Sequence, residues 1–266
     1  MNSYKRILVV ILLAVVSITT VSGQDIIKRI VKNGELRLGT TTTQPPYSLK
    51  TKDDVIVGYE IDIAKLLASS MNVELKIVEL PFNGLLDALE KGKVDIVMSG
   101  MTINTERNMN VAFVGPYMVS GKSILTKTVS LGKLKDKDQI NNSEISLVTL
   151  KGSTSEKFVK TSLPKAQLTT TENYEEAIKL VMDDKVTGMI ADIEIIQVTM
   201  MRYQNSDLAI LEEALTIEPI GMALPANDHL FLNLVENYVS RLKLTGALEQ
   251  TQKYWFKNGN WLLQMK

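Results

Sequence analysis

The chain has 266 residues, of which 45% are hydrophobic and 23% charged, with 30 basic and 30 acidic side chains. These proportions are ordinary for a globular protein of one or two domains and exclude a disordered chain. The balanced charge argues against a nucleic-acid partner, the absence of cysteine excludes disulfides and thiolate metal sites, and the single histidine, His229, disfavours a zinc site or a Ser-His-Asp triad.

The first 23 residues have the pattern of a secretory signal peptide. Lys5 and Arg6 precede the apolar run 7–16, and small residues surround Gly23, after which we expect cleavage. An uncleaved membrane anchor is the alternative, but the apolar run is shorter than the ~20 residues that span a bilayer. The sequence therefore predicts a protein that is periplasmic or secreted and carries no lipid-bearing cysteine.

The rest of the chain alternates short strands with helices. In the first half, the hydrophobic spacing predicts strands over 35–40, 73–78 and 94–98 and helices over 58–71 and 85–89. In the second half, it predicts strands over 144–150, 186–191 and 217–225 and helices over 155–162, 174–182, 229–244 and 246–256. Because the segments KGKVDIVMSG and DDKVTGMIAD end the two repeats alike, we expect two similar α/β lobes.

Nothing after residue 225 begins a third unit, so we expect the last two helices to return to the first lobe. This gives a discontinuous first lobe of residues 24–118 and 219–266, and a second lobe of residues 119–218. Two extended crossings, near 119–121 and 216–218, would join the lobes. A cleft between two lobes is a favoured place for a small ligand.

Polar side chains follow the predicted strands, at the edge where open α/β sheets bind ligands. Arg107 is a fork that grips a carboxylate, Thr154 lies at a predicted helix N-terminus that attracts anions, and Asp192 could accept from an ammonium group. The set is complementary to a zwitterion. On spacing alone, however, such an Arg is more often a surface charge and such an Asp a helix cap.

Seven motifs resemble those of the bacterial extracellular solute-binding proteins for polar amino acids. Over residues 25–257, in the family's order, they are GYEIDIAKLLA from Gly58, SGMTINTER from Ser99, FxxPY from Phe113, KGST from Lys151, AD at Ala191, EPIGMAL from Glu218 and QKYWF from Gln252. The resemblance implies the two-lobed α/β fold of type II periplasmic binding proteins, each lobe a sheet flanked by helices. It also implies a monomeric receptor that closes on an amino acid, delivers it to the membrane permease of an ABC importer, and needs no cofactor or metal.

Matched by position, these motifs imply which groups would hold the ligand's α-carboxylate. Arg107 would grip it, helped from the same lobe by Thr102 and the backbone that begins at Ser99. Thr154, with the amide of Ser153, would reach it from the other lobe.

The resemblance also implies the rest of the site. Asp192 would take the α-ammonium, and Phe82 stands where the family has an aromatic wall over the ligand side chain. Thr41 and Gln44 depart from the family, which commonly has an acid and an aromatic residue there. This departure argues against a lysine or arginine ligand and for a more polar pocket, in which Thr41 and Gln44 either bind the ligand or face solvent.

The main alternative is an enzyme on the same fold. The chain resembles exported cyclohexadienyl dehydratases at 99–107 and 152–158, and Lys122 matches a lysine important for their catalysis. Their loop aspartate falls on Thr43, however, and Glu194 is one residue away from the place of their catalytic glutamate. We therefore expect a binding protein rather than a carbon–oxygen lyase, with Lys122 as a charge on a hinge strand. A sensor ectodomain, which normally precedes a membrane span and a signalling module, is a weaker hypothesis.

Overall fold

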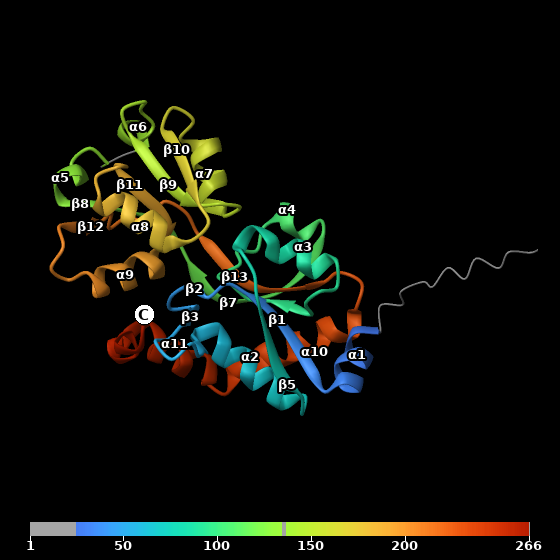
Figure 1. Ribbon diagram of the computed structural model, residues 1–266. Helices are drawn as coiled ribbons and strands as arrows, with labels where there is room; N and C mark the ends of the chain where they lie inside the picture. The colour runs from blue at the N-terminus through green and yellow to red at the C-terminus, as the bar shows by residue number, and fades with distance from the viewer. Residues whose placement is uncertain (1–24, 135–136, 266) are drawn as a thin grey trace, which may run out of the picture.

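The computed structural model describes residues 25–134 and 137–265 and arranges them as two lobes, each built around a five-stranded sheet (Figure 1). The predicted signal peptide lies outside these residues. Within the described ranges, no helix has both the length and the apolar composition to cross a membrane. The predicted two-lobed α/β architecture is confirmed.

The sheet of the first lobe does not follow the order of the chain. From edge to edge its strands are β5 (Glu74–Glu79), β1 (Glu35–Thr40), β6 (Ile96–Val97), β13 (Glu218–Pro225) and β7 (Val111–Ser120). β1 runs parallel to β5 and β6, whereas β13 runs antiparallel to β6 and β7. A strand from late in the chain therefore lies inside the sheet that the first strands begin.

The helices of the first lobe come from both ends of the chain. They are α1 (Asp25–Asn33), α2 (Tyr59–Ser70), α3 (Leu85–Glu90), α4 (Thr105–Asn108), α10 (His229–Leu244) and α11 (Ala247–Lys257), with the 3-10 helices η1 (Phe82–Gly84) and η2 (Gly259–Gln264). A small antiparallel sheet follows β1 and consists of β2 (Thr43–Gln44), β3 (Ser48–Lys50) and β4 (Ile56–Val57). α11 packs on α2, where Trp255 Nε1 donates to Asp62 at 2.8 Å.

The second lobe is formed by one continuous stretch of the chain. Its sheet has the order β10 (Gln167–Thr171), β9 (Ser146–Leu150), β11 (Gly188–Asp192), β8 (Lys122–Lys127) and β12 (Leu208–Ile210). Its helices are α5 (Thr128–Leu131), α6 (Lys137–Ile140), α7 (Thr154–Ser162), α8 (Tyr174–Met182) and α9 (Ile193–Arg202). The boundaries predicted for the two lobes, 24–118 with 219–266 and 119–218, stay a prediction.

Hydrophobic spacing accounts for the elements that the sequence predicts. In α2, the apolar residues at helical spacing are buried, namely Ile61, Ala64, Leu67 and Ala68. β1, α8 and α10 match their predicted ranges, and the other predicted strands and helices agree apart from their ends. Among the elements that the pattern misses, β7, β8 and α9 shape the space between the lobes. β7 contains Gly115 and Pro116, which normally indicate a turn, and α9 is rich in β-branched residues, which favour strands.

Two crossings side by side join the lobes. Gly121 separates β7 from β8, and a Cβ at this position would lie 2.7 Å from Thr216 O on the other crossing. The neighbouring Lys122 donates its N–H to Thr216 Oγ1 at 3.2 Å and accepts at its carbonyl from the Leu215 N–H at 2.8 Å. The glycine therefore lets the two crossings lie directly against each other.

Asp228 joins the two ends of the first lobe and gives a test of its stability. Its buried carboxylate caps α10 by accepting from the Phe231 N–H at 2.9 Å, and it also accepts from the Ile26 N–H of α1 at 3.2 Å. We expect Asp228→Ala to lower the free energy of unfolding by about 1–2 kcal/mol, since two backbone N–H groups lose their acceptor. Urea denaturation measures the loss. Asn173→Ala, which removes a half-buried cap with one backbone partner, should cost less; equal losses would contradict the double role.

Candidate functional site

Arg107 lies at the first-lobe edge of the space between the lobes. It belongs to α4, whose N-cap Asn104 accepts from the Arg107 N–H at 2.9 Å. The guanidinium donates to Thr102 O at 2.8 Å and to Gly152 O of the second lobe at 3.5 Å, and its carbon lies 5.7 Å from the centre of the Phe82 ring. Burial lowers the Arg107 pKa, although nearby carboxylates oppose this effect. The short helix therefore places a cation between the lobes, beside the predicted aromatic wall.

Three predicted site residues of the first lobe bind one another. Gln44 Oε1 accepts from Thr41 Oγ1 at 2.7 Å and from Ser99 Oγ, and the Thr41 N–H donates to Ser99 Oγ at 3.3 Å. All three side chains are buried, so the solvent-facing alternative for Thr41 and Gln44 is wrong. Gln44 also hydrogen-bonds Tyr174 at the start of α8. The cluster thus extends into the second lobe.

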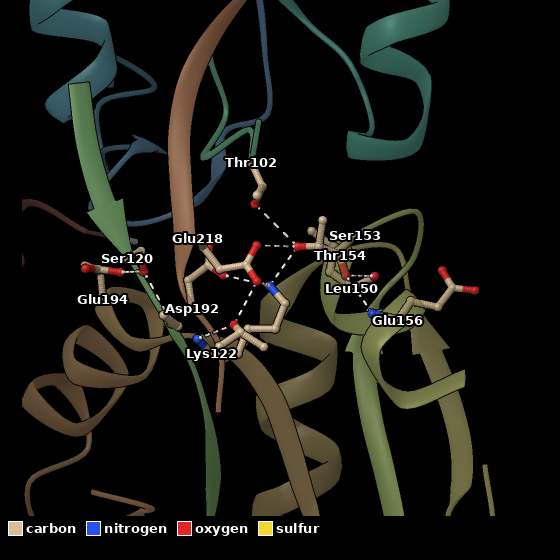
Figure 2. Close-up of polar contacts among 12 residues, drawn as sticks. Thr102, Ser120, Lys122, Leu150, Ser153, Thr154, Glu156, Asp192, Glu194 and Glu218 are labelled. Carbon is tan, nitrogen blue, oxygen red and sulfur yellow. Dashed lines mark hydrogen bonds and ion pairs between the residues drawn. The ribbon is translucent and has the colours of Figure 1, made fainter. Parts of the chain in front are cut away.

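The loop before α7 uses several of its polar groups within the second lobe. Ser153 Oγ accepts from the Glu156 N–H at 3.2 Å, and the Ser153 N–H donates to Leu150 O at 3.2 Å. The Glu156 carboxylate accepts in turn from the Gly152 N–H at 2.7 Å. The Ser153 amide is therefore engaged by the protein, whereas the hydroxyl of Thr154 points toward the first lobe (Figure 2).

Lys122 follows the hinge, as expected, but its side chain lies between the lobes, where it is 1% exposed (Figure 2). Its Nζ donates to Thr154 Oγ1 at 2.7 Å and lies 3.4 Å from Asp192 Oδ1 and 3.2 Å from Glu218 Oε1. Thr154 Oγ1 donates to Glu218 Oε2 at 3.1 Å and lies 3.4 Å from Thr102 Oγ1. We call Lys122, Thr154, Asp192 and Glu218 the buried ion cluster.

Asp192 does not act as a helix cap. It ends β11 and precedes α9, yet its side chain makes no capping hydrogen bond and turns to Lys122 instead. Burial raises the pKa of Asp192 against the attraction of Lys122. Burial also acts to raise the pKa of Glu218, but Lys122 and a hydrogen bond from Thr216 bring it below its ordinary value. Asp192 and Glu218 share the ammonium of Lys122. The negative charge of Asp192 is therefore less fully compensated by its surroundings than that of Glu218.

A second polar group connects the hinge with the first lobe. Glu194 Oε2 accepts from Tyr47 OH at 3.2 Å and from Ser120 Oγ at the end of β7. Burial raises the pKa of Glu194. The Tyr47 ring also lies against Gly100, between the predicted site residues Ser99 and Thr102. Glu194 and Tyr47 therefore connect the end of β7 with the loop that carries part of the site.

The sequence reasoning missed the contributions of Glu218 and Tyr174. Glu218 begins the EPIGMAL motif and lies beside the second predicted crossing, which was a usable signal. Tyr174 is a buried aromatic residue at a helix start, and nothing in its local pattern distinguishes it from a core residue.

A groove of about 510 Å³ opens beside the site. Arg107 and Thr154 form part of its lining, with Leu86 from the first lobe and Gly152 from the second. At its rim, Lys157 of α7 forms an ion pair with Glu106 of α4. The groove therefore opens a path from solvent to Arg107 and Thr154, the two residues predicted to hold a carboxylate.

Comparisons with known proteins identify the family of this chain. A model of the bacterial extracellular solute-binding proteins, family 3, matches residues 36–258. The L-cystine-binding protein TcyJ of Escherichia coli K12 is 22% identical over 94% of this chain and 93% of its own length, and cyclohexadienyl dehydratase of Pseudomonas aeruginosa is 26% identical over 86% and 85%. A solved structure of a putative binding component of an ABC transporter from Wolinella succinogenes, complexed with lysine, is 33% identical, covers 86% of this chain and 99% of that one, and has a TM-score of 0.83. The chain belongs to the bacterial extracellular solute-binding proteins, family 3.

Proposed function

We propose that this protein is the substrate-binding component of an amino acid ABC importer and holds an amino acid between its lobes. The observation that carries the proposal is the charge arrangement of the site. Arg107 lies near enough to Asp192 and Glu218 for both carboxylates to act on its pKa. A zwitterion between them can give its carboxylate to the arginine and its ammonium to the acids. The roles assigned to Arg107, Thr102, Ser99, Thr154, Asp192, Phe82, Thr41 and Gln44 belong to this proposal. The Ser153 amide is left out of it, because it already donates to Leu150 O at 3.2 Å.

Binding is coupled to closure of the lobes. The first lobe contributes Arg107 and Thr102, and the second contributes Thr154 and Asp192. A ligand gains contacts to the second set only when the hinge closes, so it shifts the protein toward the closed state. The proposal is supported by the 3.4 Å distance between Thr102 Oγ1 of the first lobe and Thr154 Oγ1 of the second. The closed monomer, acting in the periplasm or outside the cell, would then dock on its membrane permease.

Thermal unfolding against a panel of L-amino acids tests the proposal. The protein is first unfolded and refolded to remove ligand carried through purification. An amino acid at about 1,000 times its dissociation constant adds about 4 kcal/mol, which raises Tm by roughly 8–16 °C for a chain of this size. Tm values unchanged by every amino acid in the panel would contradict the proposal.

A dehydratase is the second candidate, and the burial of Lys122 favours it. A lysine beside two carboxylates in a cleft that excludes water is a plausible proton-transfer group, and a cyclohexadienyl dehydratase is among the relatives. Against it, Thr43 replaces the loop aspartate of those enzymes. Prephenate and arogenate are therefore included in the panel and assayed for loss of water and CO₂. Turnover without an amino acid response would favour the enzyme.

A further inference from the structure

The ammonium of Lys122 has a complete set of partners. An ammonium has three N–H donors, and Lys122 faces Thr154 at 2.7 Å, Glu218 at 3.2 Å and Asp192 at 3.4 Å. At 1% exposure, it has little access to water. The hydroxyl donor of Thr154 is also used, because it donates to Glu218 while the same oxygen accepts from Lys122. Thr154 would therefore meet a ligand carboxylate through its backbone N–H at the start of α7. Lys122 therefore has no N–H left for an anionic group of a ligand.

The charges around Lys122 determine which further charge the site can accept. One ammonium and two carboxylates give the buried ion cluster a net charge of −1, and Arg107 brings the total to zero. Glu194 lies outside this cluster and accepts hydrogen bonds from Tyr47 and Ser120, and burial raises its pKa. The cluster can thus accept one further cation, which a zwitterion supplies with its α-ammonium. A second cation on the same ligand would have no carboxylate left.

We propose that Lys122 sets the specificity of the cleft, selecting amino acids with an uncharged polar side chain and rejecting those with a cationic or anionic one. This inference rests on the proposed function. A cationic side chain meets the positive charges of Lys122 and Arg107, and like charges in a desolvated site cost several kcal/mol. An anionic side chain finds the donors of Lys122 already used, with Asp192 and Glu218 beside them.

The first lobe supports the same selection. Thr41 and Gln44 contribute hydroxyl and amide groups, and Gln44 Oε1 is already shared by Thr41 and Ser99. No carboxylate stands in these two positions to receive a cationic side chain. The Wolinella succinogenes structure, which is complexed with lysine, shows that the same fold can hold a cationic amino acid, so the selection would come from these side chains.

Calorimetric titration with glutamine, lysine and glutamate tests the inference on refolded protein. We expect the unsubstituted protein to bind glutamine at least tenfold more tightly than lysine or glutamate. In Lys122→Met, the two carboxylates lose their common counter-ion, so lysine should bind at least tenfold more tightly than before. Lys127→Met is the matched control: Lys127 lies on the same strand and pairs with Asp184 and Asp207 at the other end. Its ligand preference should stay unchanged.

A second variant separates the charge of Lys122 from its bulk. Lys122→Met combined with Glu218→Gln restores the net charge of −1, so the gain in lysine affinity should disappear. A gain that persists in the double variant, or lysine bound by the unsubstituted protein as tightly as glutamine, would overturn the inference. The comparison of lysine with glutamine on the unsubstituted protein does not depend on the folding of any variant. Absence of binding by all three ligands and the wider amino acid panel would count against the proposed function instead.

Discussion

Arg107→Ala is expected to weaken amino acid binding by about 2–5 kcal/mol, or roughly 30- to 4,000-fold, while leaving the protein folded. The guanidinium is the cation of the first lobe in the site, and its loss leaves a ligand carboxylate without a bidentate partner. Its own hydrogen bonds to Thr102 O and Gly152 O are few and lie at the cleft, so the fold does not depend on them. Calorimetric titration with the ligand found by thermal unfolding measures the change.

Two further variants make the arginine test specific. Arg107→Lys keeps the charge but loses the planar fork, so its affinity should fall between those of the unsubstituted protein and Arg107→Ala. Arg241→Ala removes an exposed arginine of α10 and should leave binding unchanged. If Arg107→Ala bound its ligand as tightly as Arg241→Ala does, Arg107 would not belong to the site.

Glu60→Gln is expected to make the protein more stable above pH 7 without changing its stability near pH 5. Glu60 is fully buried in α2, and its Oε1 accepts from Tyr117 OH and from the Gly100 N–H at 2.9 Å. Its Oε2 has no hydrogen-bond partner among the described residues. Burial raises the pKa of this carboxyl from 4.5 to about 7, despite those two hydrogen bonds. The ionised form is therefore costly, and glutamine removes that cost.

The sign of the pH dependence follows from proton uptake. Between pH 4.5 and about 7, the folded state holds a proton on Glu60 that the unfolded state has released, so stability falls as pH rises. The shift corresponds to about 3 kcal/mol, lost fully above pH 7. Urea denaturation from pH 5 to 8 should show the two proteins diverging by about this amount.

The exposed Glu249→Gln variant provides the control, since Lys253 lowers the pKa of Glu249. Its stability curve should not diverge upward from that of the unsubstituted protein between pH 5 and 8. If the stability curves of Glu60→Gln and the unsubstituted protein ran parallel over this pH range, ionisation of Glu60 would not be what destabilises the protein. Glu60 accepts a hydrogen bond from the Gly100 N–H. Ligand affinity measured over the same pH range therefore shows whether ionisation of Glu60 affects binding through the loop from Ser99 to Thr102.

The sequence allowed much of the fold to be predicted, because its helices and strands are amphipathic or buried over most of their length. α8 begins at a capping Asn and ends after a clear apolar stripe, so its range could be predicted to the residue. β7 and β8 could not be found in this way. Their pairing depends on β13 and β11, which lie far away in the chain, and Gly115 and Pro116 interrupt the local pattern of β7.

The candidate site was less predictable than the fold. The resemblance placed Arg107, Thr154 and Asp192 near the cleft, because each follows a recognisable motif. The direction in which a strand side chain points depends on tertiary pairing, which the sequence does not give. For this reason Lys122 was predicted only as a charge on a hinge strand. In the structure, Asp192 pairs with Lys122 across antiparallel β8 and β11, and Glu218 approaches from β13. The buried ion cluster therefore exists only after three separate strands have met.

The position of β13 between β6 and β7 has a consequence for the order of folding. The second lobe takes all its strands from residues 122–210, so its strand pairing can be completed once that stretch has emerged. The first sheet stays divided until residues 218–225 arrive and insert between strands made much earlier. Long-range strand pairing of this kind is slow. A nascent chain that ends just before β13 can therefore complete the sheet of the second lobe while the sheet of the first lobe stays open. The first lobe then closes only when synthesis is nearly finished.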